Sequence, residues 1–436
     1  MLGVPLGFVV AQGLPRLRRF WEPALAWPFA LPASIAALQV LPGLDRLGWS
    51  YTESAVVTVM VLLNAPYVAL RTAQALAQLD PRLAEQAAVL GAKRSERFRR
   101  VLAPALAPAW GGAAAEVYLA CVHSLSLVMI LGGGPPVETV EVTLFHRLRG
   151  GALDWTGSLI AGALLGILSL PAAWALASGA GARVQNLYAA EISEKATNRV
   201  AGALAILGLV LLVGVWVFPL LGIFSIRLTT ESAQELAHSF LGSASLAAGV
   251  VAVILATAIG WVSAVRSPRR LAYLAAASAL ASAISPMLLA LVLIFAQLAM
   301  GQDPFGYPRA VLSLALFLAF LPFAIRNLLW LQVSRPEALS EAARVCGASR
   351  TQAWWAVEWP RWRQPVGALG GLLFLWVLGE SSLTWLFTSG SESPWVTALL
   401  ARWAGQYRIE DAQAGTLLML ALSAIGFFAL NARRRA

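Results

Sequence analysis

Long apolar stretches alternate with short polar segments along the whole chain. About 20 helical residues, rising ~1.5 Å each, cross a bilayer core of about 30 Å. Even the shortest of the uncharged stretches, with 21 residues, is long enough for this. The pattern therefore predicts an all-α, polytopic membrane protein. The stretches without any charged residue are 24–44, 155–182, 200–226, 241–265, 271–302 and 412–432.

Allowing a few polar residues per span raises the expected number of transmembrane helices to about ten. Two long basic loops, 71–102 and 332–363, interrupt the spans, and a polar segment follows the fourth span. Gly, Ser and mixed charges mark this segment as a boundary. We expect a first half at 1–177, a cytoplasmic linker at 178–199 and a second half at 200–436. The expected spans are 24–44, 53–71, 103–131, 155–177, 200–224, 241–265, 271–300, 309–331, 364–388 and 412–432.

Composition supports the membrane assignment and excludes a soluble globule. Apolar residues make up 59% of the chain and charged residues 12%, against roughly 25% charged residues in soluble domains. The net charge of +10 comes from basic residues that lie between the spans. We interpret them as topology signals beside anionic lipid and expect no nucleic-acid partner.

The distribution of Lys and Arg predicts the orientation of the chain. If the spans alternate, the N-terminus, both long loops, the linker and the C-terminus lie on one side, and most basic residues fall there. Because positive residues stay cytoplasmic, we expect both termini and both long loops inside the cell.

The chain contains an internal repeat. A shift of 256 positions aligns 85–104 with 341–360, with eight of twenty residues identical. The same shift pairs Pro66 with Pro322 and Tyr67 with Phe323. Both long loops stay on one side, so the halves are predicted to be parallel repeats about an axis along the membrane normal. Spans 200–224 and 241–265 have no full counterpart, which suggests a first half shortened at its N-terminus.

Each repeated loop is expected to form a helix, a tight turn and a second helix. Apolar residues at i, i+4 and i+7 give the first helix one apolar face in each copy. Gly91 and Gly347 follow it, at a position where a left-handed residue ends a helix. Ser95 and Thr351 are expected to cap the second helix. A short amphipathic helix of this kind suits docking into a groove of a partner.

The second loop resembles the cytoplasmic EAA loop of permeases from binding-protein-dependent ABC importers. Glu341, Ala342, Ala343, Gly347 and Pro360 match that pattern in full. In the first loop Glu85, Ala87, Gly91 and Pro104 match it, and Gln86 departs from it.

The resemblance implies a fold, a location and partners. It implies the MetI-like permease fold in the inner membrane, two copies of a nucleotide-binding ATPase subunit docked on the loops, and a periplasmic or lipid-anchored substrate-binding protein. ATP hydrolysis would then occur on the separate subunits. The chain itself has no G-x-x-x-x-G-K-[ST] loop, and we expect no catalytic residue, cofactor or metal site in it.

Fused two-half permeases of this layout include those for thiamine and for ferric iron. The segment 124–148 is most similar to the first half of thiamine permeases, so thiamine or a thiamine phosphate is the expected substrate. Ferric iron is the alternative within the class, although the chain shows no cluster of oxygen ligands. Outside the class, a stand-alone secondary transporter or a membrane-embedded enzyme remain alternatives.

Five residues are candidates for the substrate pathway. Glu380 lies inside an otherwise apolar span, where an ionisable group costs roughly 2.5–3.5 kcal/mol and must face the bundle interior or water. Ser381 follows it, and Trp385 lies one turn beyond. Ser124 aligns with Glu380 in the first half, and His123 precedes it. A structural role is the competing interpretation for both Glu380 and His123.

Overall fold

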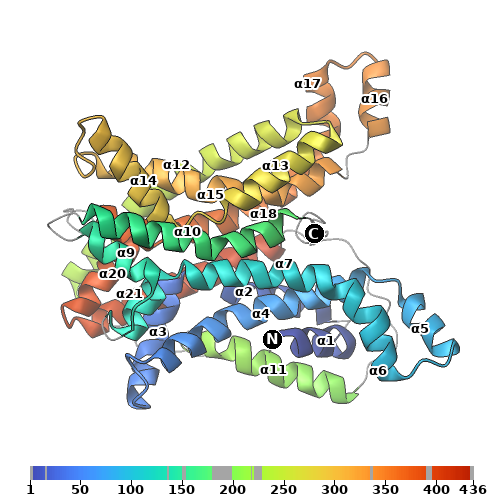
Figure 1. Cartoon of the computed structure of the whole chain (residues 1–436), viewed down its shortest axis with the longest axis horizontal. Helices are drawn as coiled ribbons and strands as arrows, with labels where there is room; N and C mark the ends of the chain where they lie inside the picture. Colours follow the sequence, from blue (N-terminus) through green and yellow to red (C-terminus); the bar gives the residue numbers. More distant parts are fainter. Residues whose placement is uncertain are drawn as a thin grey trace.

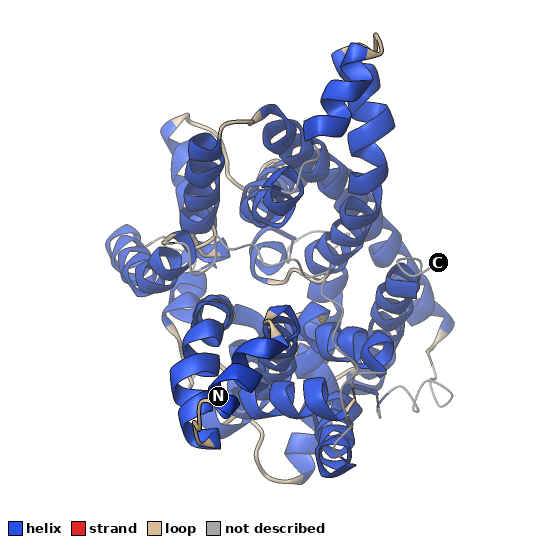
Figure 2. Cartoon of the chain, turned by 90° about the vertical axis from the view of Figure 1, so that its right-hand side faces the viewer, coloured by secondary structure: helices blue, strands red, loops and turns tan. Residues whose placement is uncertain are grey.

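The computed structural model describes residues 3–14, 17–134, 137–149, 154–178, 199–217, 219, 228–333, 337–388 and 395–432. Every regular element in these ranges is a helix, as Figure 2 shows. The expected linker at 178–199 lies almost wholly outside the described residues.

The helices up to residue 177 are α1 (Gly3–Gly13), α2 (Arg18–Ala30), α3 (Ala33–Arg46), α4 (Glu53–Gln78), α5 (Pro81–Val89), α6 (Arg94–Arg97), the π-helical η2 (Phe98–Leu102), α7 (Ala103–Val122), α8 (Leu125–Gly132), α9 (Val140–Arg149) and α10 (Trp155–Ala177). The later helices are α11 (Arg199–Val217), α12 (Thr230–Ala264), α13 (Pro268–Ala281), α14 (Pro286–Ala299), α15 (Pro308–Val333), α16 (Glu337–Val345), α17 (Arg350–Ala353), the π-helical η4 (Trp354–Glu358), α18 (Trp359–Leu378), α19 (Ser382–Thr388), α20 (Val396–Gly405) and α21 (Ile409–Ala432).

Apolar helices long enough to cross a bilayer confirm the prediction of a polytopic all-α membrane protein. Six described helices meet this criterion on their own, and three bent pairs raise the number to nine. The expected span 200–224 corresponds to a shorter apolar helix, Gly202–Val217. The six continuous spans are Glu53–Ala77, Ser95–Val122, Trp155–Ala177, Thr230–Ala264, Pro308–Leu329 and Ile409–Phe428.

Three of the expected spans are bent rather than straight. The axis turns by 92° between α2 and α3, by 88° between α13 and α14, and by 47° between α18 and α19. Pro32 and Pro286 follow the first two breaks, and the residues before them, Leu31 and Ser285, have extended ψ values of 136° and 155°. A proline disfavours the helical conformation of the preceding residue, which favours a bend at both places. The expected span 103–131 is likewise interrupted, since α7 ends at Val122 and α8 starts at Leu125.

The two halves interlock across the molecule. The last long helix of each half packs on the bent span of the other half, α10 on α13 and α14, and α21 on α2 and α3. The contact between α1 and α4 corresponds to the contact between α12 and α15 in the second half. Helix α11 packs on α1, α2 and α4. One large apolar core consequently runs through both halves.

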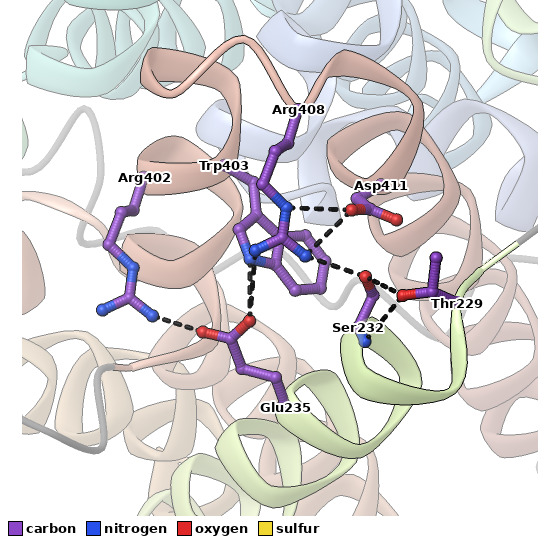
Figure 3. Close-up of polar contacts among 7 residues, drawn as sticks. All are labelled: Thr229, Ser232, Glu235, Arg402, Trp403, Arg408 and Asp411. Carbon is purple, nitrogen blue, oxygen red and sulfur yellow. Dashed lines mark hydrogen bonds and ion pairs between the residues drawn. The ribbon is translucent and has the colours of Figure 1, made fainter.

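A network of polar side chains fastens the start of α12 to the α20–α21 hairpin (Figure 3). Glu235 on α12 forms an ion pair with Arg402, accepts a hydrogen bond from Nε1 of Trp403 at 3.0 Å, and pairs with Arg408 at 3.5 Å. The Arg408 guanidinium lies 4.8 Å from the centre of the Trp403 ring and binds Asp411 at 2.9 Å. A single carboxylate therefore holds three side chains of the hairpin.

We expect Glu235→Ala to lower the free energy of unfolding by about 1–2 kcal/mol, because hydrogen bonds to charged groups contribute more than neutral ones but this carboxylate is about one third exposed. Thermal unfolding of the detergent-solubilised protein measures the effect. Glu231→Ala, an exposed position one turn earlier on the same helix, is the control. Equal shifts for the two variants would contradict a structural role for the network.

Candidate coupling loops and translocation pathway

Helices α5 and α16, which carry the two repeated loops, project from the same end of the molecule (Figure 1). Each is followed by a short helix, α6 or α17, that continues through a π-helical segment into a long span. The two π-helical segments lie 256 positions apart, at Phe98–Leu102 and Trp354–Glu358, which is the offset of the sequence repeat. The geometry of the two loops is thus repeated as well as their sequence.

Both loops turn through the same glycine motif. Gly91 and Gly347 have φ values of +82° and +89°, which confirms the left-handed conformation expected from the sequence. The N–H of Ala92 donates to the carbonyl of Ala87, and the N–H of Ala348 donates to that of Ala343, at 3.0 and 3.1 Å. The N–H groups of Gly91 and Gly347 also donate, each to the carbonyl three residues earlier at 3.0 Å, so both loops form a Schellman motif.

The cap of the second helix differs from the prediction. Ser349, not Thr351, is the N-cap of α17, and it forms a capping box with Gln352. In the first loop the backbone N–H of Lys93 donates to the Glu96 carboxylate at 3.0 Å, so Ser95 lies inside the helix rather than at its cap. The second helix therefore starts two residues earlier than predicted in each loop, at Arg94 and at Arg350.

Helices α5 and α16 expose apolar side chains at equivalent positions. Val89 and Val345 are each 88% exposed, and Leu90 is 86% exposed. Glu341 and Ala342 are exposed, whereas Ala87 and Ala343 are half-buried. The side chain of Glu85 lies outside the described part of the chain. Apolar side chains this exposed, paired across a repeat, are typical of a surface that a partner covers.

Glu380 occupies the bend between α18 and α19. Its carboxylate accepts hydrogen bonds from the backbone N–H groups of Ser382, Leu383 and Thr384, at 2.7, 3.0 and 3.2 Å. Ser381 and Trp385 are buried beside it. The acidic group therefore satisfies three of the free N–H groups at the start of a helix within the bilayer.

We expect Glu380→Gln to weaken this cap, because an amide offers one oxygen where the carboxylate offers two. A loss of about 1–3 kcal/mol is expected from hydrogen bonds to a charged group. Comparing thermal unfolding with substrate uptake separates the two interpretations of Glu380. Reduced uptake by a variant of normal stability would favour a pathway role, and parallel loss of both would favour the structural one.

His123 and Ser124 lie at the corresponding bend of the first half, between α7 and α8. The Nε2 atom of His123 lies 2.9 Å from Oγ of Ser169 on α10, and that hydroxyl donates to the carbonyl of Leu165. Because the Ser169 hydroxyl donates its hydrogen to Leu165, the Nε2–H group of His123 must donate to the Ser169 oxygen. Ser124 makes no side-chain cap. The five pathway candidates thus occupy equivalent bends in two different halves.

Contacts at these bends join one half to the other. A side chain at Gly379 would overlap the ring of Pro32, so the bend before Glu380 touches the bend between α2 and α3.

Glu141 on α9 is fully buried, and its Oε1 accepts a hydrogen bond from the N–H of Met287 at the start of α14. Sequence reasoning missed Glu141, because it is embedded in a stretch with other polar residues and resembles a surface position.

A polar cluster lies between the halves, on α4, α7 and α15. Glu116 on α7 pairs with Arg326 on α15 at 3.0 Å and accepts a hydrogen bond from the hydroxyl of Tyr67 on α4. The guanidinium of Arg71 lies over the Tyr67 ring, 5.9 Å from its centre. We refer to Tyr67, Arg71, Glu116 and Arg326 as the inter-half cluster. The repeat pointed to Tyr67, but Glu116 and Arg326 are 210 positions apart, and the sequence carried no signal that they meet.

Aromatic rings from both halves adjoin this cluster. Phe29 on α2 stacks on Tyr67, with centroids 4.1 Å apart, and meets the edge of Trp376 on α18 at 5.7 Å. Trp376 also lies 4.6 Å from Phe323 on α15. Each of these rings is only half-buried, although each lies well inside a span. We refer to Phe29, Tyr67, Phe323 and Trp376 as the aromatic group.

Comparisons with known proteins agree with this architecture. The family described as binding-protein-dependent transport system inner membrane component matches residues 3–228 and 254–433. The thiamine transport system permease protein of Brucella abortus is 27% identical over an alignment that covers all of this chain and 85% of that protein.

Sulfate permeases match a shorter part of the chain. A probable sulfate transport system permease protein of Chlorokybus atmophyticus is 29% identical over 182 residues, and that of Synechococcus elongatus is 28% identical over 182 residues. Each alignment covers 38% of this chain and less than two thirds of the relative, 63% and 65%. No solved structure shows a significant match to the chain.

Proposed function

Because this chain belongs to the family of binding-protein-dependent transport system inner membrane components, we propose that it is the permease of an ABC importer for thiamine or a thiamine phosphate. The chain supplies the pathway, and two partner ATPase subunits hydrolyse ATP. A periplasmic or lipid-anchored binding protein delivers the substrate at the opposite face. Both termini lie in the cytoplasm in this proposal.

The geometry of α5 and α16, the two proposed docking helices, supports this function best. They project from one end of the molecule, turn through the same Schellman motif and expose the same valine, Val89 or Val345, at equivalent positions. Two equivalent surfaces suit two copies of one partner. Closure of those partners would move α5 and α16 together, and the spans joined to them would carry the movement to the bends.

Thiamine is favoured by the extent of the similarity. The similarity to the Brucella thiamine permease extends over the whole chain, whereas the sulfate permeases align with 38% of it. Sulfate is the second candidate because its permeases show slightly higher identity in the part that aligns, 28–29% against 27%.

Transport by the reconstituted complex tests the proposal. The permease, its ATPase subunits and its binding protein are placed in proteoliposomes, and uptake of radiolabelled thiamine, thiamine monophosphate and sulfate is followed with and without ATP. ATP-dependent uptake of a thiamine compound, but not of sulfate, is the expected result. Uptake of any of them by the chain without ATP and partners would indicate a secondary transporter instead.

A further inference from the structure

Arg71 on α4 forms no ion pair with a carboxylate among the described residues, although Glu116 of the inter-half cluster acts on its charge. Its Nε atom is buried without a hydrogen-bond partner, and within the described ranges its guanidinium makes no ion pair, only the contact with the Tyr67 ring. Side chains of a helix lean toward its N-terminus, so Arg71 points back toward Tyr67 and the middle of α4, away from the nearer, cytoplasmic end. An ionisable side chain held inside a membrane span in this way usually has a role in function, such as binding a substrate or an ion.

The inter-half cluster as a whole has a surplus positive charge. It contains two guanidinium groups and one carboxylate, and Glu116 is already engaged by Arg326 and Tyr67. The NH1 atom of Arg326 is also buried without a partner. One carboxylate shared by two partly buried guanidinium groups leaves part of their desolvation cost unmet, and an anionic group that reached the cluster would relieve that cost. Two arginines are well suited to a phosphate, because the guanidinium fork matches its oxygens.

The aromatic group supplies the other component of a recognition site, a surface on which a ring can stack. Its rings come from α2, α4, α15 and α18, hence from both halves, and they remain half-buried at mid-span. Glu116 and Arg326 are likewise 20% and 12% exposed although they pair across the halves. Partly exposed rings next to guanidinium groups favour a planar aromatic ligand that stacks on the rings.

We propose that the inter-half cluster and the aromatic group together form a recognition site in the permease for an aromatic molecule that carries a phosphate. The Arg71 guanidinium and NH1 of Arg326 donate to the phosphate, and the aromatic group contacts the ring system. This inference rests on the proposed function and narrows it, because it selects phosphorylated thiamine over thiamine. An inorganic anion would need the arginines but not the rings.

Equilibrium binding to the permease–ATPase complex in nanodiscs, without the binding protein, tests the site directly. Leaving out the binding protein ensures that selectivity comes from the permease. The probes are radiolabelled thiamine, thiamine monophosphate and sulfate. The wild-type complex should bind thiamine monophosphate more tightly than the other two. Arg71→Gln should reduce affinity for thiamine monophosphate by roughly tenfold to hundredfold and leave affinity for thiamine unchanged, because one charge-assisted contact is lost.

Two further variants and a control complete the test. Arg71→Lys, which retains the charge, should recover part of the preference for the phosphate. Trp376→Leu should lower the affinity for thiamine and for thiamine monophosphate by the same factor. Arg269→Gln removes one exposed positive charge at the start of α13 and should change neither affinity.

Three results would overturn the inference. They are equal binding of thiamine and its phosphate by the wild type, an equal loss of both in Arg71→Gln, and tight binding of sulfate that is insensitive to Trp376→Leu. If uptake shows ATP-dependent thiamine transport while one of these results is obtained, only the recognition site is wrong. Absence of thiamine-compound uptake would instead refute the proposed function.

Discussion

Gly347→Val is expected to reduce coupling between ATP hydrolysis and transport by about tenfold while the protein remains in the membrane. The glycine has a φ of +89°, and a left-handed conformation costs an L-residue on the order of 1–2 kcal/mol, more if it is β-branched. A Cβ at this position would meet no atom within 4 Å, so the penalty is conformational and not steric. The turn should relax to another conformation and re-aim α16.

A strain of this size corresponds to roughly a five- to thirtyfold change in a conformational equilibrium. We therefore expect substrate-stimulated ATP hydrolysis and uptake in proteoliposomes to fall by about tenfold, and further in a Gly347→Val, Glu341→Lys double variant. Gly91→Val should behave similarly in the first loop.

Gly367→Val provides the matched control for the coupling test. It introduces the same side chain in α18, where φ is not positive and the Cβ also has open space. It should retain coupling. Wild-type coupling in the Gly347→Val, Glu341→Lys variant would mean that these loops are not the site of ATPase docking.

Glu116→Leu is expected to destabilise the protein more than any other single substitution considered above. It leaves the guanidinium of Arg326, which is only 12% exposed, without its carboxylate, and it removes the acceptor of the Tyr67 hydroxyl. Removing one partner of a buried ion pair costs about 3–5 kcal/mol, because the remaining charge stays uncompensated. Thermal unfolding of the purified complex measures the effect.

A double-mutant cycle separates the ion pair from simple packing at the same place. Glu116→Leu with Arg326→Leu removes both charges, so stability should recover most of the loss seen in Glu116→Leu. Losses that add instead of cancelling would show that the two side chains are not energetically coupled. Since α7 belongs to one half and α15 to the other, coupling would also demonstrate that the pair holds the halves together.

The sequence predicted the parts of the fold that depend on local patterns. Uncharged stretches such as 155–182 identified spans, and the spacing of Gly347 from the preceding helix predicted its left-handed conformation. It did not predict the bends. Pro32 and Pro286 were visible, but a proline inside an apolar stretch is compatible with both a kink and a sharp turn, and packing against the opposite half decides between them.

Candidate site residues were predictable where the chain repeats itself, or where one charge interrupts an apolar span, as at Glu380. The two repeated loops were found because two copies of one pattern aligned. The inter-half cluster was not, because Arg326 pairs with a residue 210 positions away and its equivalent in the first half, Leu70, is apolar. A single sequence contains no record of such long-range pairs, and Glu116 viewed alone was an acidic residue without an assigned role.

The two π-helical segments have a consequence for the history of the molecule. A π-helical turn is a rare irregularity, yet one occurs in each half at the same place, in Phe-Arg-Arg-Val-Leu at 98–102 and in Trp-Trp-Ala-Val-Glu at 354–358. The two segments share one residue type at equivalent positions, so the residues themselves do not enforce the distortion. Descent of both halves from one ancestral sequence that already carried the π-turn accounts for the shared position, with the side chains diverging afterwards while the backbone irregularity was kept.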